Sequence, residues 1–488
     1  MTARKTMATL LREVGYTSDA ADDLEVGGIA YASNQVQPGD VFFCVVGFKA
    51  DGHDYAPDAV ARGAAALVCE RELDLDVPQF IVDDSRKALA EASAAFFGYP
   101  SEHLALVGIT GTNGKTTTTY LVEWVARMAA HRTGLIGTVE TRIGDEHLPS
   151  KHTTPESFDL QRLLADMVDA GVDTAVMEVS SQGLDLDRVI GTRFAVAAFT
   201  NLTQDHLDYH HTLEEYFACK LRLFEAHEVG SCAVCIDDGY GRRVVEVARK
   251  AGHTVVTCGF AEDADIRAVD MRYSGTDTRF TLLHEGGRTE VSIPLVGRFN
   301  VSNAVLAITV CLELGIPLDT IVSALARAPH APGRLERVPG GERYGITVLV
   351  DYAHTPDALI KALDVVEEVT QGRTIVVFGC GGDRDRGKRP KMGAAATKAD
   401  IAIVTSDNPR SEDPEAIIAD ILPGMEDASS QVEVQPDRRS AIRTAIHLAQ
   451  PGDCILIAGK GHEDYQILGD RTIDFDDRLV AGEELDRL

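Results

Sequence analysis

The sequence predicts an α/β protein of three domains: a small N-terminal α/β domain, a central domain with a phosphate-binding loop and a mostly parallel sheet, and a C-terminal Rossmann-like domain. Its 488 residues are too many for one hydrophobic core. From about residue 104 apolar strands alternate with helical stretches, and a Pro/Gly turn near 330–338 starts a second series. We therefore place the domains at residues 1–102, 103–333 and 334–488.

The N-terminal segment is typical of a small α/β domain. Short apolar runs at residues 40–47, 64–70 and 79–84 are separated by Gly, Pro and Asp turns. The helical stretch 86–98 closes the segment, and YPSEH at 99–103 follows as a linker.

The central segment alternates strands with helices. Apolar runs at residues 104–110, 174–181, 193–202 and 231–238 predict buried strands, and residues 115–128 carry apolar side chains at helical spacing. This alternation predicts a mostly parallel sheet covered by helices.

In the last segment four apolar strands each end in a polar loop. The stretches are ITVLVDYAHTPD, TIVVFGCGGDRDRG, IAIVTSDNPR and CILIAGKGHED. Because the carboxyl ends of parallel strands share one edge of an open sheet, ligands bind in the crevice there. Four such loops therefore predict a binding site.

Composition and charge exclude several classes of protein. Lys and Arg number 47 and Asp and Glu 76, so the formal net charge is −29, which argues against a nucleic-acid surface. No apolar run approaches the roughly 18 residues of a membrane span, and the N-terminus has no long apolar segment to serve as a secretion signal. We expect a cytoplasmic protein without membrane insertion.

The nine cysteines lie mostly inside apolar stretches and predict reduced core residues. The one CxxC pair, Cys232 and Cys235, has no second Cys/His pair at zinc spacing. A buried strand is therefore favoured there over a metal or redox site.

The stretch GITGTNGKTTTT, beginning at Gly108, joins a predicted strand to a predicted helix. A glycine-rich turn at such a place directs backbone N–H groups and the helix dipole toward an anion. Lys115 would then reach the terminal phosphates of a nucleotide, and Thr116 would offer a hydroxyl to Mg²⁺. The usual loop has a glycine where this chain has Ile109. A plain turn with a solvated lysine is the alternative, which the strand–loop–helix context disfavours.

A variant loop, G-T-x-G-K-T, occurs in the Mur ligases and their folylpolyglutamate synthetase relatives, and residues 111–116 match it. Nearly the whole chain resembles the Mur ligase family, with matching stretches in the family's order. They are QPGDVFF, GFKADGHDYAPDAVARGA, TTPE, MEVSSQGL, NLTQDHLDYH, YFACKLRLF, GRFNVSNA, APGRLE, DYAHTPD, GCGGDRDRGKRP, SDNPR and GKGHED.

The resemblance implies an ATP-dependent ligase of peptidoglycan precursor synthesis. It would add meso-diaminopimelate to the D-glutamate side-chain carboxylate of UDP-N-acetylmuramoyl-L-alanyl-D-glutamate through an acyl phosphate. The implied cofactors are ATP, Mg²⁺ and a CO₂-derived carbamate on Lys220. The partners are these small-molecule substrates, without nucleic acid, and the chain is expected to be a monomer.

The resemblance also implies the residues of each site. Those for ATP are Gly111, Thr112, Asn113, Gly114, Lys115, Thr116, Thr117, Asn300, Arg334 and Asp351. Those for the UDP-muramoyl dipeptide are Ser33, Lys49, Thr153, Thr154, Ser180 and Arg188. Those for diaminopimelate are Arg384, Asp407, Asn408, Pro409, Arg410, Gly459 and Glu463. The catalytic residues are Lys115, Glu178, His206 and Lys220, and the metal ligands are Thr116, Glu178, His206 and Lys220 as its carbamate.

Glu178 and His206 would hold a second Mg²⁺, separate from the one at Thr116. Both residues follow predicted strands that we expect to be neighbours, which would bring the two side chains to one sheet edge. By its position alone, His206 would be a capping or core histidine. A zinc site at His210 and His211 is disfavoured, because no ligand set at zinc spacing completes it.

Lys220 lies beside the apolar stripe that Phe217, Leu221 and Phe224 form on a predicted helix. A lysine in such a place is usually a snorkelling surface residue. In the Mur ligases the equivalent lysine is carbamylated and supports a second Mg²⁺. Partial burial would favour the neutral amine that reacts with CO₂.

The SDNPR stretch predicts the amine substrate. meso-Diaminopimelate differs from lysine by a distal carboxylate, which Arg410 can bind through two N–H groups while Asn408 donates another hydrogen bond. Arg384 matches a second family cation, and Glu463 a family residue that pairs with the distal ammonium. An ordinary turn with a helix cap is the alternative. We predict a preference for meso-diaminopimelate over L-lysine.

Three positions depart from the family pattern: Asn34, Gln182 and Leu186. They bear on contacts with uridine and peptide and not on phosphate chemistry. The alternative functions are an L-lysine-adding Mur ligase, a folylpolyglutamate synthetase-like ligase, and a nucleotide-binding regulatory or motor protein. The four ligand-bearing strand ends argue against the last of these, because a switch needs no second binding edge.

Overall fold

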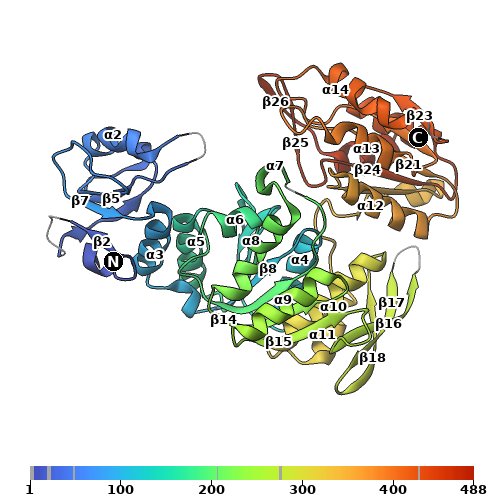
Figure 1. Ribbon diagram of the computed structural model, residues 1–488. Coiled ribbons are helices and arrows are strands. Elements are labelled where there is room, and N and C mark those ends of the chain that lie inside the picture. The colour runs from blue at the N-terminus through green and yellow to red at the C-terminus, as the bar shows by residue number, and fades with distance from the viewer. Residues whose placement is uncertain (1–4, 19–22, 48–49, 206, 274–276, 427–428) are drawn as a thin grey trace.

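The computed structural model describes residues 5–18, 23–47, 50–205, 207–273, 277–426 and 429–488. The chain forms three main sheets that follow one another from the N-terminal to the C-terminal part (Figure 1). Two-stranded ribbons pair β1 with β3 and β25 with β26. None of the described helices is long and apolar enough to cross a membrane.

The N-terminal sheet has the strand order β2-β7-β6-β5-β4 and is parallel except at β2. The predicted helix at 86–98 is α3, which begins where the Asp84 side chain accepts hydrogen bonds from the N–H groups of Arg86 and Lys87. The elements are β1 Lys5–Thr6, α1 Met7–Leu10, β2 Tyr16–Thr17, β3 Glu25–Val26, β4 Gly28–Ala30, β5 Asp40–Phe43, α2 Ala56–Ala61, β6 Ala66–Cys69, β7 Gln79–Val82 and α3 Ser85–Phe97.

The middle sheet has eleven strands in the order β11-β10-β9-β12-β8-β13-β14-β15-β16-β17-β18. It is parallel from β9 to β16 and antiparallel at both edges, so the predicted mostly parallel sheet is confirmed. The strands are β8 Ala105–Thr110, β9 Thr133–Ile136, β10 Glu140–Ile143, β11 Glu146–Pro149, β12 Thr174–Glu178, β13 Phe194–Phe199, β14 Val229–Cys235, β15 Thr254–Gly259, β16 Ile266–Tyr273, β17 Thr278–His284 and β18 Gly287–Ile293.

Helices cover both faces of the middle sheet. Alternate residues of β8 point to opposite faces, so Val107 lies in one hydrophobic cluster with α4 and α10, and Leu106 lies in another with α5 and α8. The helices are α4 Lys115–Met128, α5 Ser157–Asp169, α6 Ser181–Asp185, α7 Leu207–His210, α8 Leu213–Glu225, α9 Gly239–Lys250, α10 Arg298–Glu313 and α11 Leu318–Leu325.

One expectation about this sheet is wrong. β12, which ends at Glu178, and β13, which precedes His206, are not adjacent, because both pair with β8, which lies between them. The phosphate-loop strand therefore separates the two predicted metal-binding strand ends, although the carboxyl ends of all three strands still point to the same sheet edge.

The C-terminal sheet has the strand order β19-β20-β24-β21-β22-β23 and is parallel except at β19. The four strands predicted to end in ligand loops are β20, β21, β22 and β24, which lie side by side. The elements are β19 Glu336–Arg337, β20 Thr347–Asp351, α12 Pro356–Val369, β21 Thr374–Phe378, α13 Lys388–Ala396, β22 Ile401–Val404, α14 Pro414–Ile421, β23 Gln431–Val434, α15 Arg438–Leu448, β24 Cys454–Ala458, β25 Tyr465–Leu468, β26 Arg471–Asp474 and α16 Asp477–Leu485.

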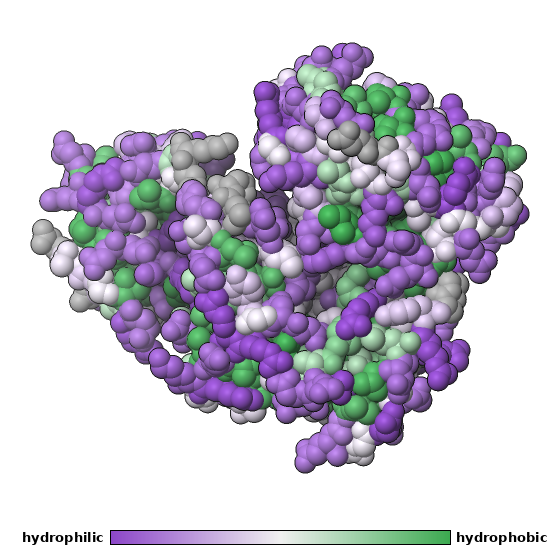
Figure 2. Space-filling model, turned by 45° about the vertical axis from the view of Figure 1, so that its right-hand side comes forward, coloured by the Kyte–Doolittle hydropathy of each residue, from purple (hydrophilic) through white to green (hydrophobic). Residues whose placement is uncertain are grey.

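All nine cysteines are buried and unpaired, as predicted. Cys232 and Cys235 lie on β14, so the CxxC pair belongs to a buried strand. The outer surface is mostly hydrophilic on the face seen in Figure 2, where a hollow separates the N-terminal lobe from the C-terminal lobe.

Candidate active site

The phosphate loop occupies residues 111–114, between β8 and α4. β8 continues to Thr110, so Ile109 is a fully buried strand residue, and the turn begins only at Gly111. Gly114 caps α4 with a φ of 86°, and a Cβ there would lie 2.2 Å from Asn303 Oδ1. Only glycine fits this position without strain. The free N–H groups of the first turn of α4 therefore lie next to the loop.

Lys115 lies across this loop. Its Nζ donates hydrogen bonds to the carbonyl oxygens of Gly111 and Thr112, both at 2.9 Å. The side chain is thus held by the loop and is not a solvated surface lysine, which places its cation beside the helix N-terminus.

A buried carboxylate faces the start of α4. Glu178 is 1% exposed and accepts hydrogen bonds from the Thr116 hydroxyl at 3.1 Å and from the N–H and hydroxyl of Thr138 at 2.9 and 3.0 Å. Within the described part of the chain, no Lys, Arg or His side chain forms an ion pair with it. Because a buried carboxylate without a counter-ion is costly, this cluster favours a bound cation. Sequence reasoning missed Thr138, which no motif marks.

Lys220 lies on α8 and is 1% exposed. Its Nζ donates to the Gly111 carbonyl at 2.9 Å, the same oxygen that Lys115 contacts, and lies 4.5 Å from the centre of the Tyr216 ring. Burial, and then the neighbouring Lys115 cation, lower the pKa of Lys220 well below its ordinary value. The fold therefore buries this lysine more completely than its helical pattern implies, and places its amine on the phosphate loop.

A cavity of about 340 Å³ lies between the phosphate loop and the C-terminal sheet. Arg334 crosses it: its Nη2 donates to Thr116 Oγ1 at 3.3 Å, and its guanidinium lies 4.8 Å from the centre of the Tyr352 ring. The cavity brings together all the predicted ATP residues except Gly111. These are Thr112, Asn113, Gly114, Lys115, Thr116, Thr117, Asn300, Arg334 and Asp351.

The structure shows a second contact across this cavity, which the sequence did not predict. The Asn113 amide and the Thr203 hydroxyl donate to Asp357 Oδ2 at 3.3 and 3.0 Å. Asp357 lies in the first turn of α12 and also pairs with Lys361 at 2.8 Å. Its place at the end of the DYAHTPD stretch is the one signal that could have marked it.

Four of the residues predicted to bind the UDP-muramoyl dipeptide lie next to Glu178. Thr153 and Thr138 share a hydrogen bond of 3.0 Å, and the Thr154 hydroxyl lies 3.1 Å from Ser180 Oγ. Arg188 Nη1 donates to the Thr154 carbonyl at 2.9 Å. Arg188 also pairs with Glu156 at 2.6 Å, so its charge is already partly neutralised.

The other two residues of this set are not part of that cluster. Ser33 begins a short 3-10 turn after β4 and has no hydrogen bond to the cluster in the described chain. Lys49 lies outside the described residues, as does the predicted metal ligand His206. His210 Nε2 lies 2.9 Å from Ser181 Oγ, and no set of three metal-binding His, Cys, Asp or Glu residues occurs among the residues that the structure describes.

The strand ends of the C-terminal sheet bring the predicted amine-binding residues together. Asn408 is 3% exposed, and its Nδ2 donates to Glu463 Oε2 at 2.9 Å. Gly459 has a φ of 117°, a conformation that favours glycine, and a Cβ there would lie 2.6 Å from Asp407 Oδ2. Glycine therefore suits the place where the loop after β24 approaches the Asp407 side chain.

The two predicted arginines differ in how they are held. Arg410 follows Pro409, has a φ of 52°, and donates through Nη1 to the Gly382 carbonyl at 2.8 Å. Arg384 is exposed. The loops after β21 and β22 therefore meet through Arg410 and leave Arg384 facing solvent.

The β25–β26 hairpin packs beside the loop after β22 and contacts it at Asp407 and Asn408. Gln466 Nε2 donates to the Asp407 carbonyl at 2.7 Å, and the Ile467 N–H donates to Asn408 Oδ1 at 3.0 Å. The sequence does not mark these contacts, because the hairpin lies beyond the last recognisable motif.

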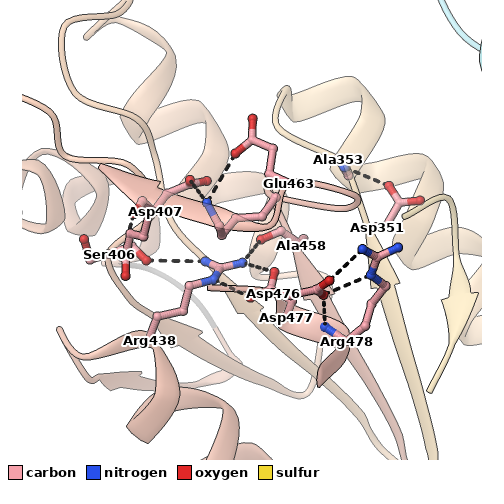
Figure 3. Close-up of polar contacts among 12 residues, drawn as sticks. Asp351, Ala353, Ser406, Asp407, Arg438, Ala458, Glu463, Asp476, Asp477 and Arg478 are labelled. Carbon is pink, nitrogen blue, oxygen red and sulfur yellow. Dashed lines mark hydrogen bonds and ion pairs between the residues drawn. The ribbon is translucent and has the colours of Figure 1, made fainter. Parts of the chain in front are cut away.

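A buried ion pair links the carboxyl ends of β22 and β24 (Figure 3). Arg438 and Asp477 are both fully buried and lie 2.7 Å apart. Arg438 also donates to the Ala458 carbonyl at 3.0 Å and the Ser406 carbonyl at 3.4 Å. The pair therefore ties the ends of β22 and β24 to α15 and α16.

The fold and site define a multi-sheet nucleotide-binding protein, in which a phosphate loop and a second parallel sheet face one cavity. Models of three Mur ligase regions match the chain: the family's catalytic domain at residues 25–110, the middle domain at 109–311 and the glutamate ligase domain at 333–461. The chain belongs to the Mur ligase family.

Individual relatives agree with this assignment. A UDP-N-acetylmuramoyl-L-alanyl-D-glutamate--2,6-diaminopimelate ligase of Clostridium botulinum is 45% identical over 480 residues, which cover 97% of this chain and 98% of the relative. A solved structure of a ligase with that name has a TM-score of 0.74 and 32% identity, and covers 99% of both chains. A MurF ligase from Thermotoga maritima, solved in complex with ADP, has a TM-score of 0.63 at 20% identity, over 94% of this chain and 96% of its own.

Proposed function

We propose that this protein is an ATP-dependent ligase that joins meso-diaminopimelate to the D-glutamate side-chain carboxylate of UDP-N-acetylmuramoyl-L-alanyl-D-glutamate. The observation that carries the proposal is the cavity in which the phosphate loop faces Arg334 and Asp351. Tyr352, which lines this cavity, also interacts with Glu463 of the proposed amine-binding loops. The relatives of similar length named for this reaction support it. The product is a peptidoglycan precursor.

The reaction has two steps. A carboxylate oxygen of the substrate attacks the γ-phosphorus of ATP, and ADP leaves. The amine then attacks the acyl carbon of the acyl phosphate, loses its proton, and expels phosphate. Negative charge accumulates at the reacting groups in both steps. The cations of Lys115 and Arg334, which both line the cavity, would stabilise that charge.

The residues around Glu178 fit Mg²⁺. Hydroxyl and carboxylate oxygens are the ligands that Mg²⁺ prefers, and the buried Glu178 forms no ion pair with the residues that the structure describes. Thr116 would hold one Mg²⁺, and Glu178 and His206 would hold a second, supported by a carbamate on Lys220. When bound, Mg²⁺ would neutralise charge on the phosphates.

We place the substrates at the predicted residues. The UDP-muramoyl dipeptide would lie along Thr153, Thr154, Ser180 and Arg188, with Ser33 and Lys49 binding its nucleotide end. Its contacts at Asn34, Gln182 and Leu186 would differ from the family pattern. We also retain domain boundaries after residues 102 and 333, a cytoplasmic location and a monomeric state as proposals.

One assay tests this function. Purified protein is incubated with ATP, Mg²⁺ and the muramoyl dipeptide, and phosphate release is measured with meso-diaminopimelate, L-lysine or no amine. We expect release that depends on both the dipeptide and meso-diaminopimelate. Faster release with L-lysine would identify a lysine-adding ligase. Release with a folate and glutamate, but not with the dipeptide, would identify a folylpolyglutamate synthetase. Amine-independent hydrolysis alone would indicate a nucleotide switch.

Arg410→Ala should reduce the preference for meso-diaminopimelate over L-lysine by about 2 kcal/mol or more, a typical value for a charge-assisted contact. Arg410 is held at Gly382 beside Asn408, where it can bind the carboxylate that lysine lacks. The ratio of kcat/KM for the two amines measures the effect. Arg386→Ala, which removes an exposed arginine from the loop after β21, is the matched control. An unchanged ratio in Arg410→Ala would refute the assigned role.

A further inference from the structure

Lys460 is a fully buried lysine inside the proposed amine pocket. It lies in the loop after β24, and its side chain has no exposed surface. Its Nζ lies 3.2 Å from Glu463 Oε2, 3.3 Å from Asn408 Oδ1 and 3.9 Å from Asp407 Oδ1. Burial of an ammonium is costly unless the charge is paired, so the hydrogen bonds to Glu463 and Asn408 and the ion pair with Asp407 stabilise Lys460 in this position. Lys460 takes no part in the two reaction steps described above.

The lysine fixes the orientation of the Asn408 amide. Asn408 Oδ1 accepts two hydrogen bonds, from Lys460 Nζ and from the Ile467 N–H at 3.0 Å. With its oxygen held by two donors, the amide must turn its NH₂ group toward Glu463, to which Nδ2 donates. One N–H of Asn408 then remains to donate to a substrate carboxylate.

The lysine also opposes the rise in the pKa of Glu463 that burial causes. Burial raises the pKa of Glu463, the Asp407 carboxylate raises it further, and the Lys460 cation lowers it. The charged or titratable groups that face Glu463 are Lys460 on its own loop, Asp407 after β22, Tyr352 after β20, Tyr465 on β25 and Arg438 on α15 (Figure 3 shows Asp407, Arg438 and Glu463). Lys460 is the cation that contacts the carboxylate directly. Glu463 accepts both of its hydrogen bonds, from Lys460 and from Asn408, through Oε2, and no described residue donates to Oε1.

We propose that Lys460 is a positioning residue for the amine substrate, which pairs with one oxygen of Glu463, leaves the other oxygen for an ammonium, and directs the Asn408 amide toward a carboxylate. This inference rests on the proposed function and extends it. Lys460 does not contact the reacting atoms. It acts through the two side chains that contact the far end of the amino acid.

The test compares three variants: Lys460→Met, which removes both charge and donor, Lys460→Gln, which keeps a donor, and Lys460→Arg, which keeps the charge. Lys391→Met, which removes an exposed lysine from α13, is the matched control. For each variant, KM is measured for ATP, for the muramoyl dipeptide and for whichever amine the wild-type protein consumes, and kcat/KM for the amine is followed against pH. Thermal melting checks the fold, and if Lys460→Met does not fold, the Gln and Arg variants carry the comparison.

We expect Lys460→Met and Lys460→Gln to raise KM for the amine at least about tenfold, with the other two KM values changed less than about threefold. Loss of the cation raises the pKa of Glu463, so the acid limb of the amine profile should move to higher pH in these two variants. In Lys460→Arg it should stay near the wild-type position. A wild-type amine KM and pH profile in Lys460→Gln would overturn the proposal, as would a parallel rise in all three KM values. A wild-type protein that consumes neither amine would instead refute the proposed function itself.

Discussion

Lys115→Ala is expected to lower the rate of ADP formation by about 100- to 1,000-fold, the loss typical when one group that stabilises transition-state charge is removed. The γ-phosphoryl group gains no proton during transfer, so its negative charge has to be stabilised by cations such as Lys115 beside the loop. In the structure Lys115 is held over the loop by two carbonyl oxygens, close to where the phosphates would lie.

Initial rates at saturating ATP and dipeptide measure this effect, and melting temperature measures the fold. Because Lys115 makes two loop contacts, some loss of stability is expected in Lys115→Ala. Lys115→Met keeps the aliphatic chain and separates the two effects. Lys391→Ala, on an exposed helix face, should retain wild-type rates. A folded Lys115→Met protein with near-normal turnover would show that this lysine does not stabilise the transferred phosphoryl group.

Lys220→Ala is expected to be nearly inactive, with a loss of about 100-fold or more, because it would remove the proposed carbamate, an anion that would support the proposed Mg²⁺. The proposed carbamate forms when the neutral amine attacks the carbon of CO₂: a C–N bond forms, one C=O electron pair moves to oxygen, and the nitrogen loses a proton. Burial and the nearby Lys115 cation lower the pKa of Lys220, so its neutral form is populated at lower pH than in an exposed lysine.

Two measurements check this role. Formate or acetate should partly restore Lys220→Ala, because a small carboxylate can occupy the place of the carbamate, and it should not restore Lys115→Ala. Carbon-13 NMR with labelled bicarbonate should show a carbamate signal in the wild-type protein that Lys220→Ala lacks. An unmodified amine in the active wild-type protein would contradict the proposal.

The strand–loop–helix at the phosphate loop could be predicted from local pattern. Periodicity placed α4 at Lys115–Met128, and glycine spacing placed the loop before it. The same patterns predicted the helix that carries Lys220 and the four parallel strands of the C-terminal sheet, which the structure shows to be adjacent. These features depend on residues a few positions apart, which the sequence displays directly.

The environment of each side chain depends on residues far along the chain. Thr116 meets Arg334 across 218 positions, and Lys220 meets Gly111 across 109. The spacing of residues in the sequence does not predict contacts between such distant positions. The expected adjacency of β12 and β13 failed for this reason, since β8 inserts between them.

By itself the sequence determined the α/β class, the phosphate loop and the ligand-bearing strand ends of the last sheet, because each arises from local periodicity and turn chemistry. Only the tertiary structure decided that Lys220 is wholly buried on the phosphate loop, that Glu178 forms no ion pair among the described residues, and that Lys460 is buried against Glu463 and Asn408. Burial and electrostatic pairing are set by which segments the fold packs together, so these charges acquire their roles only when the sheets assemble.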